Sequence, residues 1–182
     1  LSDYDYQINT VYQYARHSHI DILIISLGTI GPFIDYLDIE GFLEKFKDMT
    51  VIILEEEISG YPCLTIDNRT GFRECLEHLI HKHGFKKICY INGKRNNRDC
   101  SERLEVYLEV MKENGLSVEP DMYPYGNLSS YCDKVVEKLL DQYPDTEAIC
   151  FANDYMTIAG YRVLKARGLK VGQDIAVTGF DD

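Results

Sequence analysis

The stretch of sequence that decides the fold is AICFANDYMTIAGYRVLKARGLKVGQDIAVTGFDD, residues 148–182. An apolar run predicts a buried strand over 148–151, apolar residues at helical spacing predict a helix over 154–166, and a second apolar run predicts a strand over 175–178. A strand, a helix and a strand in this order are typical of a parallel sheet, because the helix returns the chain to the edge where the first strand began. The polar residues at 153 and 154 then stand where a buried strand stops.

The same alternation of strands and helices extends through the rest of the chain. We expect an α/β protein with doubly wound parallel sheets in two lobes, 1–66 and 67–182, and a segment that is incomplete at both ends. Further strands are expected at 22–26, 51–54, 64–66 and 88–91. Further helices are expected at 4–15, at 33–46, after the capping residues Asp67 and Asn68, at 101–113 and at 131–140. The apolar stripe of the helix at 101–113 is expected to contain Leu104, Tyr107, Leu108 and Met111.

Composition and charge exclude several classes of protein. With 182 residues, 45% of them hydrophobic, the chain is long and apolar enough to form a folded core. No run approaches the roughly 18 consecutive apolar residues that a membrane span needs, and the first residues lack the pattern of a signal peptide, so no membrane partner is expected. The net charge of -11 repels phosphate backbones, so this segment is not expected to contact nucleic acid directly.

The cysteines and histidines predict neither a disulfide nor a metal site. The six cysteines show no C-x-x-C spacing, and Cys89 and Cys150 fall inside apolar strand runs, so we interpret them as reduced thiols of a cytoplasmic protein. His78 and His81 lie three residues apart on a predicted helix with His83 close behind, but no carboxylate or cysteine completes a ligand set. We therefore expect no metal and no cofactor.

Polar residues follow the carboxyl ends of three predicted strands. They are the runs 92–97, 153–154 and 179–182. In open parallel sheets the carboxyl ends of the strands and the N-termini of the helices point polar groups into one crevice, where ligands bind. We therefore expect Asn153 at the rim of a binding cleft, with Asp154 beside it as a helix cap.

Three motifs carry a resemblance to a known family. LTIDNRTGFRECLEHLI (64–80), KICYINGKRNNRDCSERLEVY (87–107) and the stretch 148–182 together resemble the effector-binding domain of the LacI/GalR family of bacterial transcriptional regulators, a periplasmic-binding-protein type I fold. The resemblance covers most of residues 20–182. It implies two lobes that close on a small polar ligand, either a sugar or a nucleobase-like molecule, in a homodimer that contacts DNA only through a domain absent from this segment.

The resemblance also implies which residues bind the ligand. Arg103 matches the family's ligand-gripping arginine, Asn153 its ligand amide and Asp181 its ligand carboxylate. Arginine and carboxylate groups pair with vicinal hydroxyls, and an amide both donates and accepts hydrogen bonds. This set therefore suits a polyhydroxylated or heteroaromatic molecule.

Three further positions match contact positions of the family. Asp99 and Asn97 match variable contact positions upstream of the arginine, and Glu55 matches an acidic position contributed by the first lobe. Spacing alone leaves structural alternatives open, because Arg103 is one helical turn from Asp99 and could simply pair with it, and Asp181 could lie in a solvated turn.

The sequence departs from the family pattern at two places, and the second leaves the output of the domain open. Val106 and Tyr107 stand where the family usually has a glycine followed by phenylalanine or tyrosine, which is expected to change how the helix packs. HKHGF (81–85) is one residue longer than the usual form and resembles sensor domains joined to diguanylate cyclases and histidine kinases. A sensory input domain of that kind, or a solute-binding protein of a transporter, therefore stays an alternative to the transcriptional regulator.

An enzyme is not predicted. The sequence has no G-x-S-x-G elbow, no G-x-x-x-x-G-K-[ST] loop, no G-x-G-x-x-G turn and no nucleophile placed beside a base. We therefore predict a module that senses a small molecule by binding it.

Overall fold

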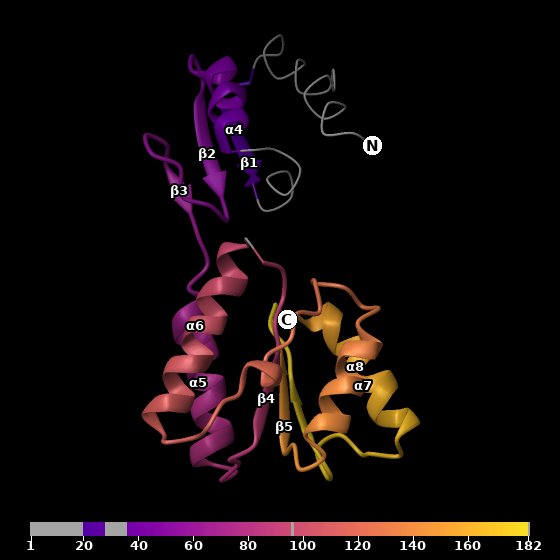
Figure 1. The fold of residues 1–182 in the computed structure, drawn as a ribbon. Coiled ribbons are helices and arrows are strands. Elements are labelled where there is room, and N and C mark those ends of the chain that lie inside the picture. Colours follow the sequence, from indigo (N-terminus) through magenta and orange to yellow (C-terminus); the bar gives the residue numbers. More distant parts are fainter. Residues whose placement is uncertain (1–19, 28–35, 96, 182) are drawn as a thin grey trace. The chain divides into compact units, whose positions relative to one another are not determined.

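The computed structural model describes residues 20–27, 36–95 and 97–181, and Figure 1 shows its ribbon. The helix expected over 4–15 and the start of the helix expected over 33–46 lie outside these residues. The chain divides into two compact units, Leu1–Ile66 and Asp67–Asp182.

The first unit contains a parallel three-stranded sheet in the order β1-β2-β3. Its elements are β1 (Ile22–Ser26), α4 (Tyr36–Leu43), the 3-10 helix η2 (Glu44–Phe46), β2 (Thr50–Leu54) and β3 (Cys63–Leu64). Val51 and Ile53 alternate along β2 and are buried in one cluster with Leu43 and Phe46 of the helical segment. This period-two burial is what an amphipathic strand requires when helices cover one face of its sheet.

The third strand of this unit differs from the expected strand at 64–66. β3 contains only Cys63 and Leu64, which pair with Ile53 and Leu54. Leu64 and Ile66 are 67% and 56% exposed. A strand is thus present and overlaps the predicted one at Leu64, but its predicted extension to residue 66 was wrong.

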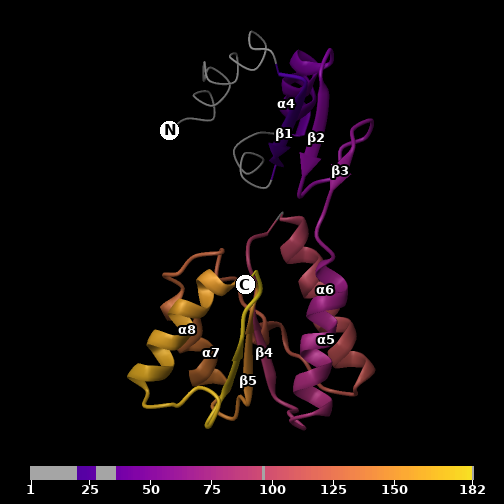
Figure 2. The ribbon, with the colours of Figure 1, turned by 180° about the vertical axis from the view of Figure 1, so that it is seen from behind.

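The second unit contains a parallel sheet in the order β4-β5-β6. Its elements are α5 (Asn68–His81), β4 (Ile88–Ile91), α6 (Arg98–Glu113), the 3-10 helix η3 (Pro120–Met122), α7 (Asp133–Gln142), β5 (Ala148–Phe151), α8 (Asp154–Ala166) and β6 (Ala176–Thr178). Figures 1 and 2 show α5 and α6 on one face of this sheet and α7 and α8 on the other. Every residue of β4 and β5 is buried, as a parallel sheet covered on both faces requires. The predicted alternation of strands and helices around parallel sheets is confirmed.

Four boundaries in this unit differ from the predicted ones. α6 begins at Arg98 rather than at 101, and α7 ends at Gln142 rather than at 140. α7 begins at Asp133 rather than at 131, because Tyr131 is 85% exposed and Cys132 occupies the N-cap position. β6 begins at Ala176, because Ile175 forms an isolated bridge with Val171.

The buried face of α6 also differs from the expected stripe. Tyr107 and Met111 are buried as predicted, but Leu108 is 38% exposed, and Val106 and Val110 are fully buried in its place. Val106 and Tyr107, the pair that departs from the family pattern, are thus core residues.

Ion pairs between α5 and α6 line the face of α6 that turns away from the sheet. Arg69 lies 2.7 Å from Glu109 and 3.1 Å from Glu105, and Arg73 lies 2.6 Å from Glu113, measured between nitrogen and oxygen. Each exposed pair stabilises the fold only weakly, by roughly 0–1 kcal/mol. Burial of Val106 and Val110 is the larger contribution to the orientation of α6, and it leaves Glu105, Glu109 and Glu113 placed to pair with α5.

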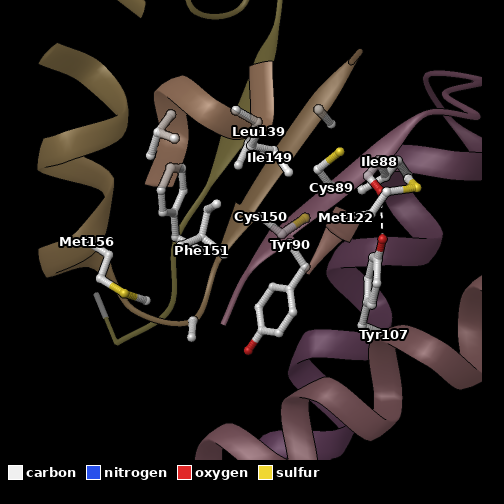
Figure 3. Close-up of a cluster of buried hydrophobic side chains, with 14 of the residues drawn as sticks. Ile88, Cys89, Tyr90, Tyr107, Met122, Leu139, Ile149, Cys150, Phe151 and Met156 are labelled. Carbon is white, nitrogen blue, oxygen red and sulfur yellow. Dashed lines mark hydrogen bonds between the residues drawn. The ribbon is translucent and has the colours of Figure 1, made fainter. Parts of the chain in front are cut away.

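The core of the second unit is shown in Figure 3. The hydroxyl of Tyr107 donates to the backbone carbonyl of Ile88 at 2.8 Å, which connects α6 to β4 inside the core.

All six cysteines are free thiols. Among the described residues, no helix is both long enough and apolar enough to cross a membrane.

Candidate ligand-binding site

The loops that follow β4, β5 and β6 open at one edge of the second sheet, because the three strands are parallel. The loop after β4 is fixed by the segment that follows η3. The backbone N–H of Asn92 donates to the carbonyl of Pro124 at 2.8 Å, and the N–H of Gly126 donates to the carbonyl of Asn92 at 2.7 Å. The polar strand ends that the sequence singled out therefore lie along a common edge.

The loop after β5 leads directly into α8. The Oδ1 atom of Asn153 accepts a hydrogen bond from the backbone N–H of Met156 at 3.0 Å, so Asn153 is the N-cap of the helix. The expectation that Asp154 caps this helix was wrong, since Asp154 is its first residue. Because the oxygen of the Asn153 amide is used by the helix, its Nδ2 group is the part that can donate to a ligand.

The loop after β6 is attached to the start of α8. The backbone N–H of Asp154 donates to the carbonyl of Phe180 at 2.8 Å. A Cβ atom added at Gly179 would lie only 1.7 Å from Oδ1 of Asp154. A glycine at this position is therefore what lets the loop that carries Asp181 approach the helix.

Arg103 connects α6 to both of these loops. It is 5% exposed; its Nε donates to the carbonyl of Asp99 at 3.1 Å and its Nη1 donates to the carbonyl of Ala152 at 2.5 Å. Its guanidinium carbon lies 4.2 Å from the centroid of the Phe180 ring. Among the described residues Nη2 makes no hydrogen bond, although it lies 3.9 Å from Oδ2 of Asp99, so its N–H groups can serve a ligand. Arg103 thus pairs with Asp99 within α6 and also contacts the loops after β5 and β6.

Asp99 is held by a buried amide of the neighbouring helix. Asn68 is 1% exposed, and its Nδ2 donates to Oδ1 of Asp99 at 2.8 Å and to Oε2 of Glu102 at 3.0 Å. The sequence predicted Asp67 and Asn68 as caps of α5. Only Asp67 caps it, by accepting the backbone N–H groups of the next turn, whereas Asn68 joins α5 to α6.

Asn97 also has a structural partner. Its Oδ1 accepts the backbone N–H of Cys100 at 2.9 Å, which makes it the N-cap of α6. Capping fixes its oxygen and leaves the amide nitrogen for other partners. Contact of Asn97 and Asp99 with a ligand stays a prediction.

Asp181 lies in the electrostatic field of the same group. Asp181 is exposed, as a solvated turn would have it, but partial desolvation still raises the pKa of its carboxyl. The positive charge of Arg103 lowers this pKa, and the negative charges of Asp154 and Asp99 raise it. Its φ of 121° is uncommon for a residue with a side chain. The structure thus brings Arg103, Asp99 and Asp181 together, with Asn153 one residue beyond the carbonyl that Arg103 binds.

Glu55 belongs to the first unit, where it follows β2. Its Oε2 accepts a hydrogen bond from the Ser26 hydroxyl at 2.9 Å, and its backbone N–H donates to the carbonyl of Leu64 at 2.9 Å. Its φ of 75° places it in the left-handed region. The carboxylate is therefore positioned at the carboxyl ends of β1 and β2, and its part in ligand binding stays a prediction.

Two further residues of the second unit were not singled out from sequence. Phe180 stacks on Arg103, and its position inside the motif TGFDD was the available signal. Tyr90 carries a hydroxyl into the otherwise apolar strand ICYI (88–91), and that polar group in a buried strand was a signal as well.

Two of the histidines singled out from sequence lie side by side. Nε2 of His78 lies 3.1 Å from Nε2 of His83. In the described part of the chain no group of three or more His, Cys, Asp or Glu side chains could hold one metal ion.

Comparison with known proteins gives the fold and the family that the sequence indicated. The family model described as a periplasmic binding protein-like domain matches residues 76–182. The transcriptional regulator CelR of Thermobifida fusca is 33% identical over 172 residues, which are 93% of this chain and 49% of CelR. The transcriptional repressor CytR of Escherichia coli K12 is 26% identical over 164 residues, 87% of this chain and 46% of CytR. The chain spans about half the length of these relatives.

Solved structures resemble this chain over most or all of its length. A complex of CelR with cellobiose superimposes with a TM-score of 0.75 at 26% identity, covering 94% of this chain and 52% of the other. A LacI-family regulatory protein from Chloroflexus aggregans gives a TM-score of 0.80 at 27% identity, covering 100% of this chain and 64% of the other. The predicted fold class is confirmed. The chain belongs to the periplasmic binding protein-like domain family and is homologous to transcriptional regulators of the LacI type.

Proposed function

We propose that this chain is the effector-sensing part of a LacI/GalR-type bacterial transcriptional regulator and that it binds a small, polar, sugar-like molecule. The observation that carries the proposal is the group of Arg103, Asn153 and Asp181 at the carboxyl edge of the second sheet. Ligands bind at this edge in open α/β sheets. The related CelR structure, described as a complex with cellobiose, supports a sugar as the ligand.

The chemistry of the group fits a molecule with neighbouring hydroxyls. Nη2 of Arg103 and Nδ2 of Asn153 donate hydrogen bonds, and the carboxylate of Asp181 accepts them. Because Arg103 is already held by two backbone carbonyls and an aromatic ring, ligand binding does not need to order it. Asp99, Asn97 and Glu55 are proposed as additional contacts.

Signalling is proposed to follow from ligand-driven lobe closure. A ligand that binds one arrangement of the two units more tightly than another shifts the equilibrium towards that arrangement, by no more than the difference between the two affinities. DNA is proposed to be contacted by a domain outside these residues, since the net charge of the chain is -11.

The protein is proposed to bind its ligand without transforming it and to act in the cytoplasm. CelR and CytR are both named as transcriptional regulators, which supports this reading over a cyclase or kinase input domain and over a transporter component. The six free thiols support a reducing compartment.

A homodimer is proposed to form through α8. Three large side chains at helical spacing, Tyr155, Ile158 and Tyr161, are 56%, 44% and 52% exposed. Exposed apolar stripes of this kind are typical of association surfaces. An isologous contact between two copies would cover both stripes at once.

Titration calorimetry tests the proposed function on the intact protein. The probes are cellobiose, lactose, glucose, galactose, ribose and adenosine, followed by a measurement of operator DNA affinity with and without each probe. We expect saturable binding of at least one probe, and a change in DNA affinity caused by that same probe. Chemical conversion of the probe, or binding with no change in DNA affinity, would contradict the proposal.

A further inference from the structure

The core of the second unit contains two neighbouring tyrosines with opposite surroundings. Tyr90 on β4 and Tyr107 on α6 are both fully buried, and their ring centroids lie 5.5 Å apart. Figure 3 shows their hydroxyls pointing in opposite directions, with that of Tyr107 directed at Ile88. The Tyr107 hydroxyl donates to the Ile88 carbonyl at 2.8 Å.

The Tyr90 hydroxyl is buried and has no hydrogen-bond partner among the described residues. Buried tyrosine hydroxyls almost always have a partner, because withdrawing the group from water without replacing its hydrogen bonds is unfavourable. A tyrosine kept here with no protein partner is therefore best explained by a partner that is not part of the chain.

The surroundings of Tyr90 lead to the proposed ligand site. The Phe72 ring lies 5.3 Å from the Tyr90 ring and 6.4 Å from the Phe180 ring, and Phe180 in turn stacks on Arg103 at 4.2 Å. Burial raises the pKa of the Tyr90 phenol, and the positive charge of Arg103 lowers it, as expected for two groups close together. Tyr90 packs against Tyr107 of α6, the helix that also carries Arg103, so its ring lies on the same side of the sheet as Arg103.

We propose that the Tyr90 hydroxyl is a specificity-determining group of the ligand site, which forms its hydrogen bond only when a hydroxylated ligand is bound. The inference rests on the proposed function, and it adds a residue within the buried strand β4 to the residues named above. It favours a ligand whose hydroxyl reaches past Arg103 towards β4. A ring serving only to fill space would need no hydroxyl, since phenylalanine would occupy the same volume.

Tyr90→Phe and Tyr107→Phe form a matched pair for the test, because each removes one hydroxyl from the same cluster. Calorimetry of the intact protein with the sugar panel measures affinity, and denaturant unfolding of the ligand-free protein measures stability. Tyr90→Phe is expected to weaken binding roughly three- to tenfold and to leave the denaturation midpoint unchanged or higher. Tyr107→Phe is expected to lower the midpoint and to leave the affinity unchanged.

A deoxy series of the sugar that binds best sharpens the result. The analogue that lacks the hydroxyl facing Tyr90 is expected to bind the parent and Tyr90→Phe equally, while the other analogues still distinguish them. Equal affinity of the parent and Tyr90→Phe for every sugar that binds would overturn the inference and leave the proposed function standing. A parent that binds none of the sugars would overturn the proposed function, and this inference with it.

Discussion

The guanidinium of Arg103 on α6 stacks on the ring of Phe180 in the loop after β6, with 4.2 Å between the guanidinium carbon and the ring centroid. The same guanidinium donates to the carbonyl of Ala152 in the loop after β5. One buried side chain thus fixes the positions of three elements at the edge where Asn153 and Asp181 lie. A cation held in this way is positioned before any ligand arrives.

Gly179→Ala is expected to destabilise the second unit. The new Cβ would lie 1.7 Å from Oδ1 of Asp154 and 3.1 Å from Cγ2 of Thr157, so the side chains at the start of α8 or the loop itself must move. Overpacking of this kind lowers the free energy of unfolding by about 1–3 kcal/mol. Ligand affinity is expected to fall too, because the loop carries Asp181. Denaturant unfolding and calorimetry measure the two effects.

Gly71→Ala is the control for this substitution. Gly71 lies within α5, and no atom lies within 4 Å of an added Cβ there. Because alanine favours a helix over glycine, the free energy of unfolding is expected to rise by roughly 0.5–1 kcal/mol. If Gly179→Ala unfolded at the same denaturant concentration as the parent, the close approach of Asp154 to Gly179 would be wrong.

Ligand affinity is expected to decrease on acidification through the titration of Asp181. Partial burial raises the pKa of this carboxyl above the ordinary value of about 3.9, and Arg103 only partly opposes the shift. Since the ionised form accepts hydrogen bonds from the ligand, affinity falls as the pH drops through the raised pKa. Asp181→Asn is expected to remove this part of the pH dependence.

The same group acts on folding with the opposite sign. A folded-state pKa above the unfolded value means that the folded protein binds the proton more tightly. The contribution of Asp181 to stability therefore increases on acidification and is lost as the pH rises through the folded pKa.

The predicted pH dependence of ligand affinity is measured by calorimetry at a series of pH values from about 4 to 7. A parent and an Asp181→Asn variant with identical pH profiles would show that the carboxylate does not bind the ligand.

The site is expected to prefer neutral sugars over phosphorylated ones. The carboxylates of Asp99 and Asp154 raise the pKa of Asp181, and the positive charge of Arg103 lowers it. A sugar phosphate brings a further negative charge into this field, and its affinity is expected to be at least roughly tenfold lower than that of the neutral sugar at low salt. Calorimetry with both forms of the same sugar measures the ratio. Tighter binding of the phosphorylated form would contradict the expectation.

Self-association is expected to depend on the exposed face of α8. Ile158→Asp puts a charge between Tyr155 and Tyr161 and is expected to shift a dimer towards monomer by at least roughly tenfold in dissociation constant, because burying an unpaired charge is unfavourable. Sedimentation equilibrium measures the shift. Leu108→Asp on α6 makes the same kind of change at a residue that is 38% exposed and should leave the association unchanged. Equal effects of the two substitutions would place the contact elsewhere.

The sheet of the second unit could be predicted from sequence because its signals are local. Continuous apolar runs over 88–91 and 148–151 correspond to strands that are buried along their whole length. The intervening helices predict that the strands pair in parallel. Parallel strands place the loops after β5 and β6, which contain the Arg103 partners Ala152 and Phe180, at one edge of the sheet. The resemblance to a family then named Arg103, Asn153 and Asp181 within that edge.

The remaining features depend on contacts that sequence spacing does not encode. The pairing of α6 with α5 includes the contact between Arg73 and Glu113, which are 40 residues apart. The role of Asn68 comes from a hydrogen bond to Asp99, 31 residues away. The unpaired hydroxyl of Tyr90 is visible only once every neighbour is in place. Local patterns predict elements, whereas these polar contacts require the packed structure.

The measurement that tests the central claim most directly is the affinity of Arg103→Lys and Asp181→Asn for the sugar that binds the parent best. Lysine keeps the charge of Arg103 but loses the planar set of donors that reaches the Ala152 carbonyl, and asparagine keeps the size of Asp181 but loses its charge. Asp145→Asn, an exposed residue in the turn before β5, is the control. We predict that each of the first two substitutions weakens binding at least roughly tenfold while the control binds like the parent. Unchanged affinity in both Arg103→Lys and Asp181→Asn would contradict the claim that this edge of the sheet holds the ligand.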